Sequence, residues 1–140
     1  MLGFPLVCAV TPTVLAAAVA FLAGCGRIYV AGGLTTAGET AAIYAVDPVG
    51  HTVHRIGGLP APRAYGALVP LGGALYYVGG KTASGTPLPT VLRIDPQTGR
   101  TTVAARLPRA LAEPTAVALA GQIVVLGGEG SNAVYELTPR

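Results

Sequence analysis

An internal repeat constrains this chain more than any other feature of its sequence. Three segments end in a short apolar run followed by a glycine pair: RIYVAGG at 27–33, ALYYVGG at 74–80 and QIVVLGG at 122–128. Their last glycines, Gly33, Gly80 and Gly128, recur at nearly equal intervals. Self-similarity at a fixed period of this length predicts a fold in which one supersecondary unit is used several times.

One period of the repeat contains four stretches with the composition of β-strands, and the third unit stops after its third stretch. In the second unit these are approximately 65–70, 75–78, 90–94 and 101–105, and glycine pairs or an Asp-Pro turn separate them. The stretches are too short for helices and too continuously apolar for a sheet with one face in water. They therefore predict short sheets that are covered on both faces, with glycines where the chain leaves a strand or crowds a neighbouring backbone.

The glycine pair after a four-residue apolar strand, followed by an Asp-Pro turn, resembles the kelch repeat, whose period is also similar. Tyr44 and Tyr135 stand before the turn position as in that family, whereas Leu92 replaces the tyrosine in the second unit, and the chain has no Trp. The resemblance covers roughly residues 27–140. It implies an all-β fold, an incomplete kelch-type β-propeller of four-stranded antiparallel blades, with an apolar segment before it.

The repeat boundaries divide the chain into an apolar segment at 1–26 and three kelch-type units at 27–60, 61–108 and 109–140. A propeller closes with about four to eight blades, so these units do not close a ring by themselves. We therefore expect a fragment of a larger propeller or a subunit that assembles. Exposed faces on the terminal blades favour self-association, because a stacked repeat buries its apolar surface against its neighbours.

The segment 1–26 contains no Asp, Glu, Lys, Arg or His. Its apolar run ends in Leu-Ala-Gly-Cys, which resembles the lipobox of bacterial lipoprotein signal peptides and implies lipidation at Cys25. We favour this interpretation, which predicts export and membrane association in the cell envelope through the N-terminus. An uncleaved membrane helix is one alternative. The other takes residues 16–22 as the first strand of the first blade, in a cytoplasmic protein, because this stretch aligns with the start of the next repeat.

Several kinds of chemistry lack the residues that they need. The nine Lys or Arg and six Asp or Glu residues are spread through the repeats, and the net charge of +3 forms no basic patch for nucleic acid. His51 and His54 lie around a turn and its following strand, at a separation that makes their side chains diverge, so no metal site is expected. Asp47 and Asp95 occupy equivalent turns, where Asp before Pro bonds to local backbone. We expect no cofactor and no enzymatic activity.

The resemblance therefore implies a non-enzymatic binding or scaffolding module with an unknown protein or carbohydrate ligand. The segments that enter each blade's first strand line a mouth of the channel in kelch propellers, which makes Arg63, Tyr65 and Arg109 the candidate binding residues. Arg63 and Arg109 are separated by almost one period and are expected on the same rim. Lys81 and the loop 82–88 are expected on the opposite rim and are the next candidates. The alternative function is a piece of a kelch-type oxidase or sugar-acting propeller whose catalytic residues lie in missing blades.

Overall fold

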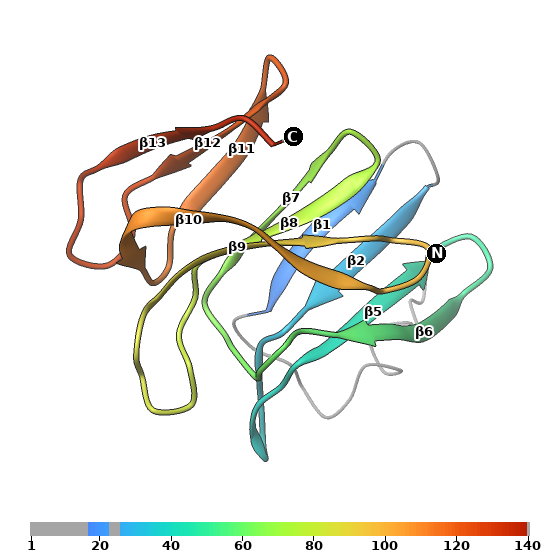
Figure 1. Ribbon diagram of the computed structural model, residues 1–140. Helices are drawn as coiled ribbons and strands as arrows, with labels where there is room; N and C mark the ends of the chain where they lie inside the picture. The colour runs from blue at the N-terminus through green and yellow to red at the C-terminus, as the bar shows by residue number, and fades with distance from the viewer. Residues whose placement is uncertain (1–16, 23–25, 140) are drawn as a thin grey trace, which may run out of the picture.

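A computed structural model describes residues 17–22 and 26–139, and within them all regular secondary structure is β-strand (Figure 1). The strands are β1 (Ala18–Leu22), β2 (Arg27–Ala31), β3 (Leu34–Thr35), β4 (Gly38–Glu39), β5 (Ala42–Asp47), β6 (Thr52–Gly58), β7 (Ala67–Leu71), β8 (Ala74–Val78), β9 (Leu88–Ile94), β10 (Thr101–Leu111), β11 (Thr115–Leu119), β12 (Gln122–Leu126) and β13 (Val134–Leu137).

The strands form three antiparallel sheets, one for each sequence repeat. The first sheet has the order β1-β2-β5-β6, the second has the order β10-β9-β8-β7, and the third contains β11, β12 and β13. A separate short hairpin of β3 and β4 lies between β2 and β5 along the chain. The expectation of an all-β fold with four-stranded antiparallel sheets is confirmed for the first two repeats. The third repeat has three strands in the described part of the chain.

The first sheet begins before Arg27. Strand β1 pairs with β2 along its whole length, in a register that sets Ala18 opposite Ala31 and Val19 opposite Val30. The alternative alignment of residues 16–22 predicts a strand here, and that strand is present. Cys25 and residues 1–16, which carry the rest of the lipoprotein interpretation, lie outside the described residues. In the part of the chain that is described, no helix has the length and apolar character needed to span a membrane.

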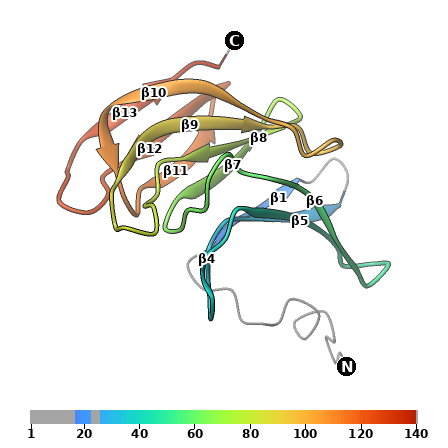
Figure 2. The ribbon, with the colours of Figure 1, turned by 60° about the horizontal axis from the view of Figure 1, so that its bottom comes forward.

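The three sheets pack face to face, and the second lies between the other two (Figure 2). Successive side chains of a strand point to opposite faces, so β8 divides its residues between two clusters. Leu75 and Tyr77 pack with the first sheet, whereas Tyr76 and Val78 pack with the third. All five residues of β8 are buried. This arrangement explains why the strand is apolar throughout rather than at alternate positions.

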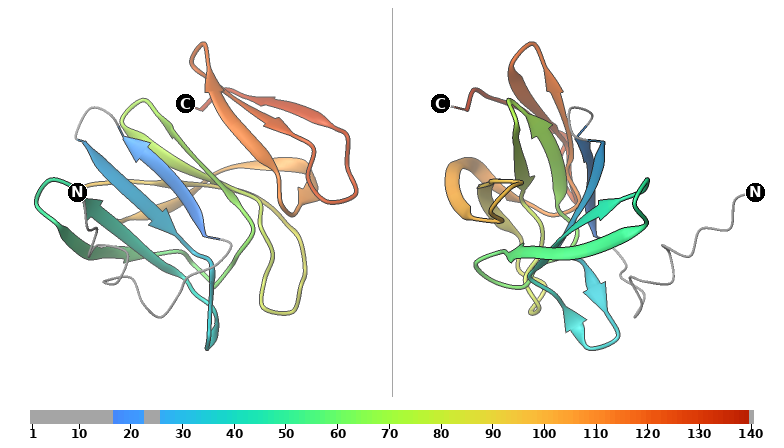
Figure 3. Two further views of the ribbon diagram at one scale, coloured as in Figure 1. Left: turned by 180° about the vertical axis from the view of Figure 1, so that it is seen from behind. Right: turned by 90° about the vertical axis from the view of Figure 1, so that its right-hand side faces the viewer.

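The strands that begin the three sheets are neighbours. Strand β7 contacts β1 of the first sheet and β11 of the third, and the view from behind shows the three side by side (Figure 3). The chain therefore passes from sheet to sheet in the same direction, with each sheet's first strand beside that of the next. The loops that enter β7 and β11 lie at the same end of the molecule as the loops that follow β8 and β12, because the first strand of each sheet is antiparallel to the second.

The Asp-Pro turns at the other end have the role that the sequence predicts. The Asp47 side chain accepts hydrogen bonds from the backbone N–H groups of Val49 and Gly50, both at 2.9 Å. The Asp95 side chain accepts them from Gln97 at 2.8 Å and Thr98 at 3.3 Å. These backbone donors favour the charged carboxylate and lower the pKa of both aspartates. The two carboxylates thus stabilise turns of separate sheets.

Candidate functional site at the loop rim

Backbone hydrogen bonds at one end of the sheets define equivalent positions in successive repeats. The N–H of Gly33 donates to the Arg63 carbonyl at 2.9 Å, and the N–H of Gly80 donates to the Leu111 carbonyl at 3.0 Å. Leu111 is therefore the structural counterpart of Arg63 in the next repeat. Arg109 is not, although its spacing from Arg63 suggested that it was. The two-position offset between Arg109 and Leu111 shifts Arg109 back along β10 and away from the crossing.

The glycine pairs allow neighbouring repeats to approach closely at this end. A Cβ atom on Gly80 would lie 2.8 Å from the Ala64 carbonyl oxygen, and one on Gly128 would lie 2.8 Å from the Ala112 carbonyl oxygen. Both glycines also have positive φ, 96° and 108°, which side chains disfavour. The same contact recurs one repeat later, so the glycine period in the sequence reflects a repeated crossing of two backbones.

The loops of the second and third sheets are joined at this crossing. Ala64 and Lys81 exchange backbone hydrogen bonds of 3.0 and 2.8 Å, the N–H of Glu113 donates to the Tyr65 carbonyl at 2.8 Å, and the N–H of Glu129 donates to the Ala112 carbonyl at 2.7 Å. We call the segments 59–66, 79–87, 112–114 and 127–133 the loop rim. Lys81 lies on the same rim as Tyr65, so its expected placement on the opposite rim is wrong. The reason is that the loop after β8 folds back beside the segment that enters β7.

Four rim residues occupy two repeated positions. Tyr65 and Glu113 are separated by one repeat, and both have positive φ, 61° and 54°. Non-glycine residues rarely adopt this left-handed conformation. Its recurrence indicates that this backbone shape is a repeated feature of the fold. Lys81 and Glu129 each directly follow a glycine pair and are likewise one repeat apart. The rim therefore presents a regular pattern of exposed or half-buried side chains.

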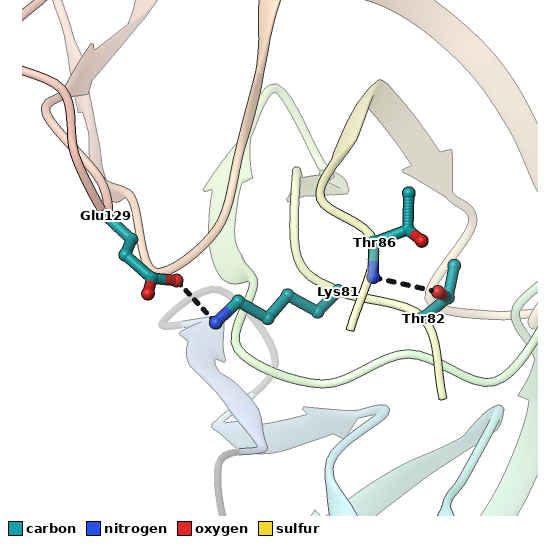
Figure 4. Close-up of polar contacts among 4 residues, drawn as sticks. All are labelled: Lys81, Thr82, Thr86 and Glu129. Carbon is teal, nitrogen blue, oxygen red and sulfur yellow. Dashed lines mark hydrogen bonds and ion pairs between the residues drawn. The ribbon is translucent and has the colours of Figure 1, made fainter. Parts of the chain in front are cut away.

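These side chains form a small polar cluster. The Lys81 ammonium forms an ion pair with a Glu129 carboxylate oxygen (Figure 4) and lies 5.6 Å from the centroid of the Tyr65 ring. The hydrogen bond from Lys81 to Glu129, with the additional negative charge of Glu113, raises the pKa of Lys81. The Lys81 side chain is 23% exposed and that of Glu129 is 59% exposed. Both charges, beside the tyrosine ring, are within reach of a ligand.

The loop after Lys81 adds three hydroxyl groups. The hydroxyls of Thr82 and Ser84 are 2.9 Å apart, those of Ser84 and Thr86 are 3.1 Å apart, and the N–H of Thr86 donates to the Thr82 hydroxyl at 3.3 Å (Figure 4). A backbone bond from Gly85 to Thr82 at 2.8 Å closes the turn. Ser84 and Thr86 are exposed. Hydroxyls held in this way offer both donors and acceptors in the loop that follows Lys81.

The Arg63 side chain lies beneath the rim rather than on its surface. The residue is only 5% exposed, and its guanidinium donates to the Thr90 hydroxyl at 3.0 Å and lies 5.7 Å from the Tyr77 ring centroid. Burial lowers the pKa of Arg63 and raises that of Tyr77 to about 12. Among the described residues the Arg63 Nε has no hydrogen-bond partner. Arg63 therefore joins the rim to the second sheet, whereas Arg109 is exposed on β10.

The structure thus brings one of the three predicted binding residues, Tyr65, into a cluster of exposed polar groups. Lys81 is a member of that cluster that the sequence indicated only as a secondary candidate, and Glu113 and Glu129 are members that it did not indicate. A signal for two of them was present, because Lys81 and Glu129 follow the repeated glycine pairs directly. The ion pair between Lys81 and Glu129 depends on the crossing of two loops, which the spacing alone does not reveal.

Other hollows and titratable groups show less organisation. A cavity of about 360 Å³ between the second and third sheets is lined by Tyr76, Val91 and Ile123, with Arg93 and Thr138 among its polar lining residues. The residues that the structure describes contain no group of three or more His, Cys, Asp or Glu side chains placed to hold a metal ion. Both histidines of the turn after β5 and of β6 are exposed. The loop rim is therefore the most organised polar surface described.

No family model and no curated protein matches this chain.

Proposed function

We propose that the chain is a non-enzymatic binding module of the kelch-type β-propeller kind, whose sheets are blades and whose loop rim holds a protein or carbohydrate ligand. The observation that carries the proposal is the recurrence of exposed or half-buried side chains at equivalent rim positions, Tyr65 with Glu113 and Lys81 with Glu129. Loops on a rigid scaffold are a common place for binding residues.

The arrangement of the sheets supports the propeller part of the proposal. Each repeat forms one antiparallel sheet, the sheets stack face to face, and their first strands β1, β7 and β11 are neighbours. Radially repeated sheets with this order are what a propeller requires. The glycine pairs permit the backbone crossing between adjacent repeats, and they are the element of the sequence that resembles the kelch repeat.

The chemistry of the rim supports a ligand rich in hydrogen-bonding groups. Tyr65 offers an aromatic surface, Lys81 and Glu129 offer charges of both signs, and Ser84 and Thr86 offer hydroxyls. An aromatic ring beside donors and acceptors suits a sugar ring or a peptide edge. Paired charges of opposite sign favour neither a strongly anionic nor a strongly cationic ligand.

Binding is tested by presenting the purified full chain to glycan and peptide arrays and measuring affinity for the best ligand by calorimetry. Tyr65→Ala and Lys81→Ala should each weaken binding about tenfold, which corresponds to about 1.4 kcal/mol. The matched control is Gln97→Ala, an exposed turn residue at the opposite end of the same sheet. Equal affinity in wild type and both rim variants, or an equal loss in the control, would place the ligand elsewhere.

A further inference from the structure

The third sheet has an apolar outer face. The register of β11, β12 and β13 places Val117 opposite Val124 and Leu126 opposite Val134, and directly opposed residues share a face. Val117, Leu126 and Val134 are 46%, 40% and 60% exposed, whereas Ile123 and Val125 on the other face are fully buried against the second sheet. Valine and leucine are therefore in contact with solvent across the middle of this sheet.

This outer face consists of positions that pack against the next sheet elsewhere in the chain. The residues of the second sheet that face the third are Val69, Tyr76, Val78 and Val91. Those of the first sheet that face the second, at equivalent positions, are Ala20, Tyr29, Ala31 and Ile43. The strand registers place Val117, Val124, Leu126 and Val134 at these positions in the third sheet. This type of face is therefore covered by a neighbouring sheet in the first and second sheets. Among the described residues it is exposed in the third sheet.

The first sheet has a partly exposed face of the complementary type. The residues of the second sheet that face the first are Leu68, Leu75, Tyr77, Leu92 and Ile94. Their equivalents in the first sheet are Val19, Ile28, Val30, Tyr44 and Val46. Val19 is 56% exposed, Ile28, Val30 and Tyr44 are half-buried, and Val46 is buried. The two outer faces of the chain thus carry the two halves of a junction that it already forms twice.

We propose that two copies of this chain assemble head to tail, with the third sheet of each copy packed on the first sheet of the other. Two such junctions close a ring of six sheets, which lies within the range of about four to eight blades for propellers. The inference rests on the propeller arrangement proposed above and not on the ligand. Because the contact joins two different faces, it closes a ring when the rotation from sheet to sheet returns the second copy to the first, and it continues into an open filament when it does not.

The charged residues on the two outer faces and the types of those faces both favour head-to-tail packing of a second copy. Glu136 lies opposite Val124 on the outer face of the third sheet, and Arg55 lies opposite Tyr44 on the outer face of the first. Both side chains are exposed. Head-to-tail packing brings faces of opposite charge together. Packing of two third sheets instead pairs faces of the same type, which occurs at neither junction inside the chain, and brings two Glu136 carboxylates to one interface.

Sedimentation velocity of the full chain tests the assembly, with one variant on each face. We expect the wild type to be a dimer, and Val19→Lys and Val134→Lys each to raise the dissociation constant at least about tenfold, because each places an ammonium group in an apolar interface. Val49→Lys is the matched control, since Val49 is 88% exposed in a turn away from both faces. It should remain dimeric. Circular dichroism in dilute solution checks that every variant is folded.

Mixing the two variants distinguishes head-to-tail packing from other contacts. A mixture of Val19→Lys and Val134→Lys has one junction with both faces intact, so dimers should form more readily in the mixture than from either variant alone. If Val19→Lys fails to fold, Arg55→Glu replaces it on the same face, and Glu136→Arg should then restore association with it. A monomeric wild type, dimers that only Val134→Lys disrupts, or no recovery on mixing overturns the proposal. Ligand binding by the monomeric variants would leave the proposed function standing.

Discussion

The second and third sheets have similar sequences and different surroundings. Strand β8 reads ALYYV and is buried at all five positions, whereas the equivalent strand β12 reads QIVVL and is buried only at Ile123 and Val125. The difference does not arise within the strands, which are both apolar and both central in their sheets. It arises because, in the described part of the chain, the second sheet has a neighbour on each face and the third has one. Position in the stack decides how much of an apolar strand contributes to the core.

The comparison also separates two kinds of contact between sheets. The first and second sheets meet along two four-stranded surfaces and in a close contact between the end of β6 and the turn that precedes β10, where the Thr101 hydroxyl donates to the Gly58 carbonyl at 3.2 Å. The second and third meet through a smaller three-stranded surface, beside which a cavity of about 360 Å³ remains. We therefore expect the first junction to contribute more to stability than the second.

The largest effect is expected from truncating a residue at the junction of the first and second sheets. Leu75→Ala should lower the free energy of unfolding by about 3 kcal/mol, because it leaves a cavity between these sheets. The comparison in the third sheet is Leu119→Ala, at a residue that is 65% exposed, and its effect should stay within about 0.5 kcal/mol. Urea unfolding in dilute solution measures both, since dimerisation would cover Leu119. Similar losses would contradict the comparison.

A slightly smaller effect is expected from adding a side-chain atom where the backbones of the first and second sheets are in close contact. A Cβ atom on Gly99 would lie 1.9 Å from the Ile56 carbonyl oxygen, so Gly99→Ala must displace one backbone from the other. We expect a loss of about 2 kcal/mol beyond that of the control. The control is Gly85→Ala, because Gly85 also has positive φ and a Cβ atom there meets nothing. Equal melting temperatures for the two variants would show that the two backbones move apart without a loss of stability.

An alkaline effect should come from the same junction. Burial raises the pKa of Tyr77 to about 12, so the folded state keeps a proton that the unfolded chain begins to lose near pH 10. This contribution is fully present below about pH 10 and is lost as pH rises toward 12, with a total of about 2 kcal/mol. The lowered pKa of Arg63, which faces Tyr77, acts in the opposite direction, because the folded state gives up that proton more readily than the unfolded chain.

Tyr77→Phe should therefore reduce the decline in stability between pH 8 and about 11, as measured by urea unfolding at several pH values. Tyr135→Phe is a suitable control in the third sheet, because Tyr135 is only half-buried there. An unchanged decline in Tyr77→Phe would mean that the alkaline sensitivity arises from another group.

The smallest effect is expected at the loop rim. Glu129→Gln removes the ion pair with Lys81 but keeps the size of the side chain, and exposed pairs contribute little to stability. The melting temperature should fall slightly at low salt, and the difference from wild type should vanish at about 1 M salt, where charges are screened over about 3 Å. Glu136→Gln is the control, at an exposed glutamate on β13. A difference that persists in high salt would assign Glu129 a packing role.

The period of the glycine pairs, the four strand-like stretches and the Asp-Pro turns were all readable from the sequence. They follow local rules, because a left-handed turn needs glycine and an aspartate before proline bonds to its own turn. The strand at Ala18–Leu22 was also predictable by alignment with the next repeat, although the apolar composition of the same stretch favoured a signal segment instead. Composition could not separate the two, since a buried strand and a signal segment are both apolar.

The position of individual side chains at the rim was decided by tertiary structure. Arg63 and Arg109 looked equivalent by spacing, yet only the crossing of Gly80 with the segment before β11 shows that Leu111 is the counterpart of Arg63. The contact of Lys81 with Glu129 likewise requires two loops from different sheets. Sequence alone therefore determined the repeating unit, because it is written in local propensities. The stacking of the units decided which face is buried and which residues meet, because those depend on neighbours a whole repeat away along the chain.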